Sequence, residues 1–156
     1  MSIFKQEVDT VRSDKNKEKM RMFFNQIVDE GDASEMIYAH KVDTKTRNFI
    51  IVRKTTYIYT SYIVGYRKDD MKLVIIKTDP QFETYEEPIF FSKDTIKKAK
   101  KSFNNYAIYH QGGLMAGYTY FSLMDLYDEE YLAYIYQSKE VDAFEVFFKE
   151  FGQKNK

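Results

Sequence analysis

Residues 35–78 alternate between apolar and polar positions in the way that is typical of consecutive antiparallel strands. Runs rich in Ile, Val, Thr and Tyr, which favour strands, are separated by short polar breaks. The pattern predicts a meander of strands, which we take as the centre of one domain. The expected strands cover 35–42, 47–54, 57–66 and 71–78, with turns at 43–46 and 67–70 and an end at Asp79-Pro80.

The N-terminal 30 residues have apolar positions at helical spacing. A wholly polar stretch at 12–19 interrupts them, so the sequence allows one long helix or two, the second capped by Ser13 or Asp14. Gly31 stands where a helix C-terminus favours glycine. We expect this segment to dock loosely on the domain or against a second subunit. The apolar positions are Phe4, Val8, Val11, Met20, Phe23, Phe24 and Ile27.

Two further helices are predicted, and both begin at a serine that can act as an N-cap. The first extends from Ser92 to about Phe103 and has a thin apolar face. The second extends from Ser138 to Phe151 and carries phenylalanines at core-facing spacing. Strands are expected between these helices at 105–110, 117–124 and 131–137.

These elements predict an α+β fold, with a mostly antiparallel sheet of six to seven strands and helices packed on one face. We expect residues 1–31 to form an N-terminal helical segment and residues 32–156 a single domain. Both predicted helices begin with Ser-Lys-acid, at 92–94 and 138–140. A diverged strands-then-helix duplication is therefore possible, although the triplet is also ordinary capping chemistry.

The order of elements permits an alternative fold. Four strands, an inserted helix, three strands and a C-terminal helix resemble the pleckstrin-homology roll, with a helix inserted between its two sheets. The resemblance concerns the order of elements and includes no residue motif. It therefore implies a fold and no phosphoinositide function.

The composition excludes several classes of protein. The 156 residues suffice for one domain with its own core. The 24 Lys and Arg residues balance 24 Asp and Glu residues, so no global field attracts the chain to nucleic acid or to an anionic membrane. The absence of Cys excludes disulfides, thiolate metal sites and Cys nucleophiles. Because we find neither a secretory signal nor an apolar run of about 18 residues, we expect a cytoplasmic protein without a membrane partner.

Tyrosine is the unusual residue type, with 14 copies. It occurs at both odd and even positions of the expected strand at 57–66, which point to opposite faces of the sheet. Some rings must therefore lie outside the core unless a bulge shifts the register or both faces are covered. Exposed rings form either a cross-strand ladder or a contact surface, and we favour the contact surface. A glycine-rich loop at 110–117 either tucks its apolar tip under the sheet or contacts the same partner. The candidate partner-binding residues are Tyr57, Tyr59, Tyr62, Tyr66, Leu114, Met115, Tyr118 and Tyr120.

The predicted helix at 92–103 carries five lysines against Asp94 alone. Four of them fall roughly on one flank and could bind phosphates or an acidic partner. A solvated helix face is the simpler interpretation, because Arg is absent and acidic residues lie nearby in the sequence. The candidate anion-binding residues are Lys93, Lys97, Lys100 and Lys101.

No set of residues amounts to a catalytic motif. His40 and His110 are the only histidines, and no carboxylate at metal-ligand spacing accompanies them. The acidic residues at 125–130 lack the spacing of an EF-hand, and neither a nucleophile elbow nor a Ser-His-acid set occurs. We therefore assign no catalytic residue, no metal site and no cofactor.

Three functions remain open. The favoured hypothesis is a non-enzymatic module, of the inhibitor, immunity or adaptor type, that binds a protein partner or itself through a tyrosine-rich sheet face. The second is a nucleic-acid accessory protein that uses the lysine helix, with salt-dependent binding. The third is a small-ligand binder or enzyme with a pocket between sheet and helix.

Overall fold

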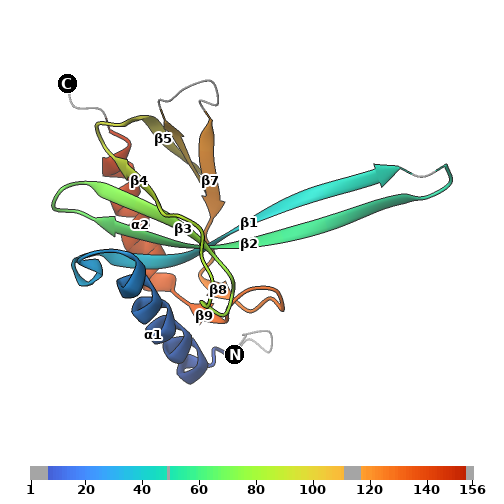
Figure 1. Ribbon diagram of the computed structural model, residues 1–156, viewed down its shortest axis with the longest axis horizontal. Coiled ribbons are helices and arrows are strands. Elements are labelled where there is room, and N and C mark those ends of the chain that lie inside the picture. Colours follow the sequence, from blue (N-terminus) through green and yellow to red (C-terminus); the bar gives the residue numbers. More distant parts are fainter. Residues whose placement is uncertain (1–6, 49, 111–116, 154–156) are drawn as a thin grey trace, which may run out of the picture.

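A seven-stranded antiparallel sheet forms the centre of the molecule, with the strand order β4-β3-β2-β1-β7-β6-β5 (Figure 1). The structure is a computed structural model that describes residues 7–48, 50–110 and 117–153. It confirms the predicted α+β class. The elements are α1 (Thr10–Ile27), the 3-10 turn η1 (Gly31–Ala33), β1 (Glu35–Asn48), β2 (Arg53–Arg67), β3 (Lys72–Thr78), β4 (Ile89–Ser92), β5 (Ile96–Ser102), β6 (Asn105–His110), β7 (Tyr118–Ser122), β8 (Leu126–Tyr127), β9 (Ile135–Tyr136) and α2 (Ser138–Phe151).

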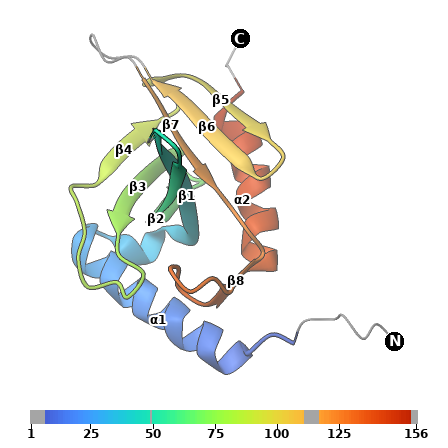
Figure 2. The ribbon, with the colours of Figure 1, turned by 90° about the vertical axis from the view of Figure 1, so that its right-hand side faces the viewer.

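The two helices cover opposite faces of the sheet. We expected one covered face, shared by helices at 92–103 and 138–151, with the N-terminal helix docked loosely or against a second subunit. Tyr66 of β2 packs against Phe144 and Phe147 of α2, whereas Phe24 of α1 lies against Gly65, the preceding residue of β2. Because successive residues of a strand point to opposite faces, alternate residues of β1–β3 are buried under α1 and the residues between them are buried under α2. Figure 2 shows the two helices on different sides of the sheet.

Helix α1 is a single helix, and Asp9 caps it by accepting a hydrogen bond from the Arg12 backbone N–H at 3.0 Å. It is not loosely docked, because Met20 and Phe24 are buried against the sheet. The expected stripe does not extend to Val11, which is exposed, and Phe4 lies outside the described residues. The polar stretch at 12–19 continues the helix over a mostly solvated surface.

The predicted helix at 92–103 is wrong, because this segment contains strand β5, which pairs with β6. A β-bulge between Ile96 and Lys98 shifts the register, so that Ile96 and Ala99 reach the same side of the sheet. Apolar residues three positions apart are therefore produced here by a bulged strand, although this spacing is typical of a helix. Four of the five lysines lie on the edge strand β5, where they discourage pairing with another sheet.

The possible duplication is also wrong, because the two Ser-Lys-acid triplets have different structures. Ser92 ends β4 and is followed by a turn, whereas Ser138 begins α2. The pleckstrin-homology alternative is matched only in part: α2 follows the strands, but the first three expected strands form only β1 and β2, and the short pair β8-β9 stands between β7 and α2. The helix that this alternative inserts between the two groups of strands is the strand β5 instead.

The hairpin of β1 and β2 is much longer than predicted and projects from the body (Figure 1). The expected turn at 43–46 is wrong: β1 continues through it, and its Thr residues favour a strand. The expected strand at 47–54 therefore spans the end of the hairpin. We call residues 41–48 and 53–60 the arm and residues 50–52 its tip.

Candidate functional site

The outer edge of β2 along the arm has no neighbouring strand in the described part of the chain. Strand β1 pairs along its whole length with residues 53–66 of β2, but β3 pairs only with residues 61–67. The mismatch in length leaves residues 53–60 with one unpaired edge. An edge of this kind presents backbone N–H and C=O groups that can hydrogen-bond to an added strand.

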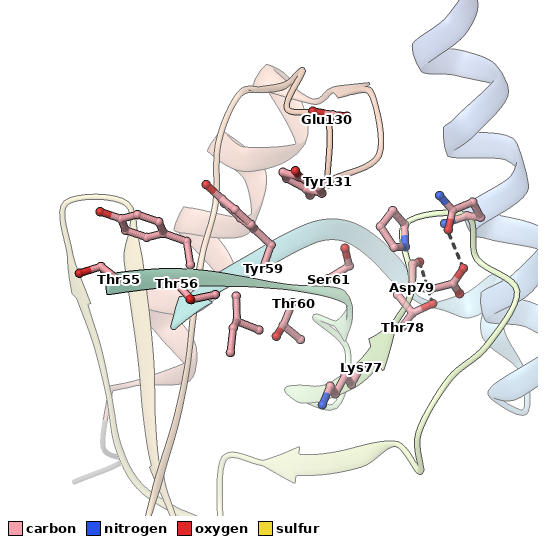
Figure 3. A pocket seen from close by; sticks show the side chains of 14 residues that line it. Thr55, Thr56, Tyr59, Thr60, Ser61, Lys77, Thr78, Asp79, Glu130 and Tyr131 are labelled. Atoms are coloured by element: carbon pink, nitrogen blue, oxygen red, sulfur yellow. Dashed lines mark hydrogen bonds between the residues drawn. The ribbon is translucent and has the colours of Figure 1, made fainter. Parts of the chain in front are cut away.

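A groove of about 970 Å³ lies beside this edge. Its floor is formed by residues 55–61 of β2, and its end by Lys77–Gln81, where β3 gives way to a loop. Figure 3 shows Tyr59 and Tyr131 next to each other on one side of β2 and Asp79 near the end of the groove. The groove thus continues the line that β3 would follow if it were longer.

Tyrosine rings provide the apolar surface of the groove. Tyr59 stacks on Tyr131 with 5.7 Å between ring centroids and 17° between planes. Tyr57 lies on the same face of the arm as Tyr59 and is 61% exposed, close to the 63% of Tyr131. Rings that have an apolar body and a hydroxyl group are enriched in protein interfaces.

The carboxylate of Asp79 stabilises a turn and is not a free base. It accepts hydrogen bonds from the backbone N–H groups of Thr84 at 2.7 Å and Glu83 at 2.8 Å. Partial burial raises the pKa of Asp79, but the hydrogen bonds from Thr84 and Glu83 outweigh this effect and hold the pKa below its ordinary value. The carboxylate is therefore ionised and fully used by the loop that closes the groove.

Of the eight predicted partner-binding residues, the six that the structure describes do not lie on one surface. Tyr57 and Tyr59 line the groove, whereas Tyr66 is part of the core, where burial raises its pKa to about 12. Tyr62 is half-buried, and burial, followed by the nearby Asp43 carboxylate, raises its pKa. Leu114 and Met115 lie outside the described residues.

Tyr118 and Tyr120 belong to a different surface, formed by β6 and β7. Tyr118 stacks on Tyr109 across the strands at 5.4 Å and on Tyr120 along β7 at 5.6 Å. The Nζ atoms of Lys98 and Lys41 lie 4.5 Å and 4.6 Å from the centroids of Tyr109 and Tyr120. Each ring thus has two neighbours, which is the cross-strand ladder that we considered as the alternative to a contact surface.

The four candidate anion-binding lysines share no helix flank, because β5 replaces the helix. Lys101 faces α2 and forms an ion pair with Glu145 at 3.0 Å. Lys100 pairs in the ladder with Ala107, on the opposite face of the sheet, and is exposed, as is Lys97. Lys93 lies in the turn before β5. The nucleic-acid hypothesis therefore loses the helix on which it depended.

The buried polar side chains around His40 and Tyr38 are hydrogen-bonded to one another and to the backbone. The Nδ1 atom of His40 lies 2.7 Å from the Tyr127 hydroxyl, and burial lowers the pKa of His40. The hydroxyl of Tyr38 is hydrogen-bonded to Ser61 and to the backbone N–H of Ala133. Among the described residues, no three potential ligand side chains converge on a metal site.

Comparisons of the chain with protein-family models, with curated proteins and with solved structures found no match. Neither helix in the described ranges has the length and apolar character of a membrane span. The groove was missed from the sequence because it depends on which strands pair and over what length. Its one available signal was the cluster of tyrosines at 57–59, which we identified without the unpaired edge beside it.

Proposed function

We propose that the chain is a protein-interaction module that binds an extended segment of a partner protein along the outer edge of β2. The unpaired edge at residues 53–60 carries this proposal. Eight residues match or exceed the usual length of a strand, so a partner strand of ordinary length fits beside it. Main-chain hydrogen bonds would supply affinity, as in other cases of strand addition.

The tyrosines of the groove would supply the contact area. In an added strand, every second side chain points to the face that carries Tyr57, Tyr59 and Tyr131. These rings lose little conformational entropy when they are covered, and aromatic anchors dominate the energetics of many interfaces. We therefore expect the bound segment to place apolar or aromatic residues at alternate positions.

A display library of random peptides of about ten residues, selected on the full chain, tests the proposal. We expect enriched peptides with alternating apolar positions that protect the amides of residues 53–60 from hydrogen exchange. Replacing Tyr59 and Tyr131 together with Ser should weaken their binding at least about tenfold. The control is Tyr118→Ser, which alters an exposed ring of the β7 ladder and should leave the affinity unchanged.

Two results would overturn the proposal. One is a library that yields no enriched peptide on the folded chain. The other is a set of enriched peptides whose affinity falls with Tyr118→Ser but not with the paired substitutions at Tyr59 and Tyr131. That second result would assign binding to the outer face of β6 and β7.

A further inference from the structure

The end of the arm combines the exposed aliphatic tip with a cluster of cations behind it. Ile51 is 92% exposed, Ile50 is at least as exposed, and Val52 is 61% exposed. Three consecutive aliphatic residues, far from either core cluster, are a costly surface to leave in water. The position of this surface at the end of a projecting hairpin suggests a contact that the body of the protein does not make (Figure 1).

The arm also separates charge within a chain whose net charge is zero. Five cations stand against the single Asp43 over residues 41–60, and no acidic residue occurs from Thr44 to Lys68. The remainder of the chain must therefore be correspondingly negative. Among the described residues, the four cations nearest the tip form no ion pair with a carboxylate. These four cations are Lys45, Arg47, Arg53 and Lys54.

The cations lie close behind the aliphatic tip. Arg53 follows Val52 directly and is opposite Asn48, while Arg47 and Lys54 form the next pair of the ladder. At about 3.3 Å per residue, even Lys45 is only about 10 Å from the last pair. Lys45, Arg47 and Lys54 share one face of the arm, and Arg53 projects from the other.

We propose that the tip binds the surface of an anionic lipid bilayer. The three aliphatic side chains enter the boundary between headgroups and acyl chains, which accommodates an apolar surface about 5–10 Å deep. The four cations then lie at the level of the anionic headgroups, where each contributes favourable electrostatic attraction. In the same step the aliphatic tip leaves water and the cations gain attraction to the anionic headgroups.

A nucleic-acid duplex fits the tip less well. A two-stranded ribbon can enter a groove of DNA, and cations can contact the phosphates. An apolar wedge between base steps uses an inserted side chain, however, whereas this tip presents three aliphatic residues in succession. Most of that surface would stay in contact with water or phosphates, so a duplex would not account for it.

Membrane binding at the tip is separate from strand addition at the edge of β2. The bilayer contact uses side chains of residues 45–48 and 50–54, whereas the groove is lined by residues 55–61 and by the body. The two contacts share only Arg53 and Lys54, whose side chains serve the bilayer and whose backbone edge serves the added strand. A partner strand could therefore bind while the tip rests on a membrane. Each proposal can fail without the other.

Co-flotation of the full chain with vesicles tests the assignment. The vesicles contain phosphatidylcholine with about 30% phosphatidylserine, and pure phosphatidylcholine serves as the reference. We expect flotation with the anionic vesicles that falls at least about tenfold when salt rises from about 50 mM to about 300 mM. Flotation with the neutral vesicles should be weaker at both salt concentrations.

Two sets of substitutions separate the contribution of the aliphatic tip from that of the cations behind it. Ile50→Ser with Ile51→Ser should reduce the partition coefficient at least about tenfold, and the binding that remains should still depend on salt. Arg47→Gln with Lys54→Gln should also reduce it about tenfold and weaken the salt dependence. The matched controls are Phe90→Ser, an exposed apolar residue of β4, and Lys98→Gln with Lys100→Gln on β5, all of which should float as the wild type does.

The assignment is overturned if the chain does not float with anionic vesicles at low salt, or if the control substitutions reduce flotation as much as those in the tip. Fluorescence anisotropy with a DNA duplex of about 20 base pairs completes the test. Tighter binding to the duplex than to vesicles, lost on substitution of Arg47 and Lys54, would assign the arm to nucleic acid instead. Circular dichroism of each variant should match the wild type, because the altered side chains are exposed.

Discussion

The side-chain amide of Gln137 pairs with both backbone groups of Tyr38. Its Oε1 atom accepts from the Tyr38 N–H at 3.0 Å, and its Nε2 atom donates to the Tyr38 carbonyl at 2.7 Å. Strand β2 lies on one side of Tyr38, but on the other side β7 pairs with β1 only at His40. Gln137 thus replaces the missing strand at this position and connects the start of α2 to the centre of the sheet.

Gln137→Leu should lower the free energy of unfolding by about 2–4 kcal/mol, because it leaves two buried backbone groups without partners. Urea unfolding followed by circular dichroism measures the change. Gln153→Leu is the control, since Gln153 is exposed beyond the end of α2 and should change stability by less than about 0.5 kcal/mol. A loss below about 1 kcal/mol for Gln137→Leu would show that water replaces the amide.

Gly65→Ala should destabilise the protein by about 2 kcal/mol or more, because its Cβ atom would lie 2.5 Å from Cζ of the Phe24 ring and 3.0 Å from Val74. The clash would displace α1 from the sheet. Phe24→Leu removes the ring, so the double variant should be little less stable than Phe24→Leu alone. A double-mutant cycle in urea measures this coupling, and additive effects would contradict the close docking of α1.

His40 should make the protein less stable as the pH falls. Burial lowers its pKa in the folded state below the value of about 6.5 in the unfolded chain. Above about pH 6.5 both states are neutral and stability is complete. As the pH falls from there through the lower pKa of the folded state, the unfolded chain binds the proton first and stability is lost.

Free energies of unfolding measured between about pH 7.5 and pH 5 test this expectation. His40→Gln should remove the part of the decline that His40 causes, although it also alters the contact with Tyr127. His110→Gln should retain the decline, since His110 lies at the end of β6 and contacts Phe91. An unchanged pH dependence in His40→Gln would show that other groups are responsible.

The outer arm should be dispensable for folding. Thr44 is opposite Tyr57 in the ladder, so replacing residues 45–56 with Asn-Gly would close a shorter hairpin at that pair. The removed side chains that the structure describes, at 45–48 and 50–56, are all exposed, and we expect the free energy of unfolding to change by less than about 1 kcal/mol. Urea unfolding checks this, and a loss above about 3 kcal/mol would show that the arm stabilises the body.

The local sequence pattern was sufficient to predict several helices and strands. The expected strand at 105–110 is β6, the expected start of the final helix at Ser138 is that of α2, and the turn at 67–70 is followed by β3 as predicted. In each case an uninterrupted hydrophobic period coincides with a clear break, although Gln137, not the expected Ser138, occupies the N-cap position of α2 and makes no side-chain cap hydrogen bond. The prediction of a helix at 92–103 was wrong because a bulge gave a strand the spacing of a helix. The prediction of a turn at 43–46 was wrong because polar Thr residues extend the strand.

The sequence by itself determined that this is an α+β chain, with a meander rich in Tyr and a phenylalanine-rich C-terminal helix, because these features follow from residue preference and period. Only the tertiary structure decided which tyrosines are covered, since α1 and α2 enclose both faces of the sheet over the body while the arm leaves it. The balanced charge likewise concealed a cationic arm. Net charge is a sum over the chain, whereas the field at a surface depends on which charges the fold brings together.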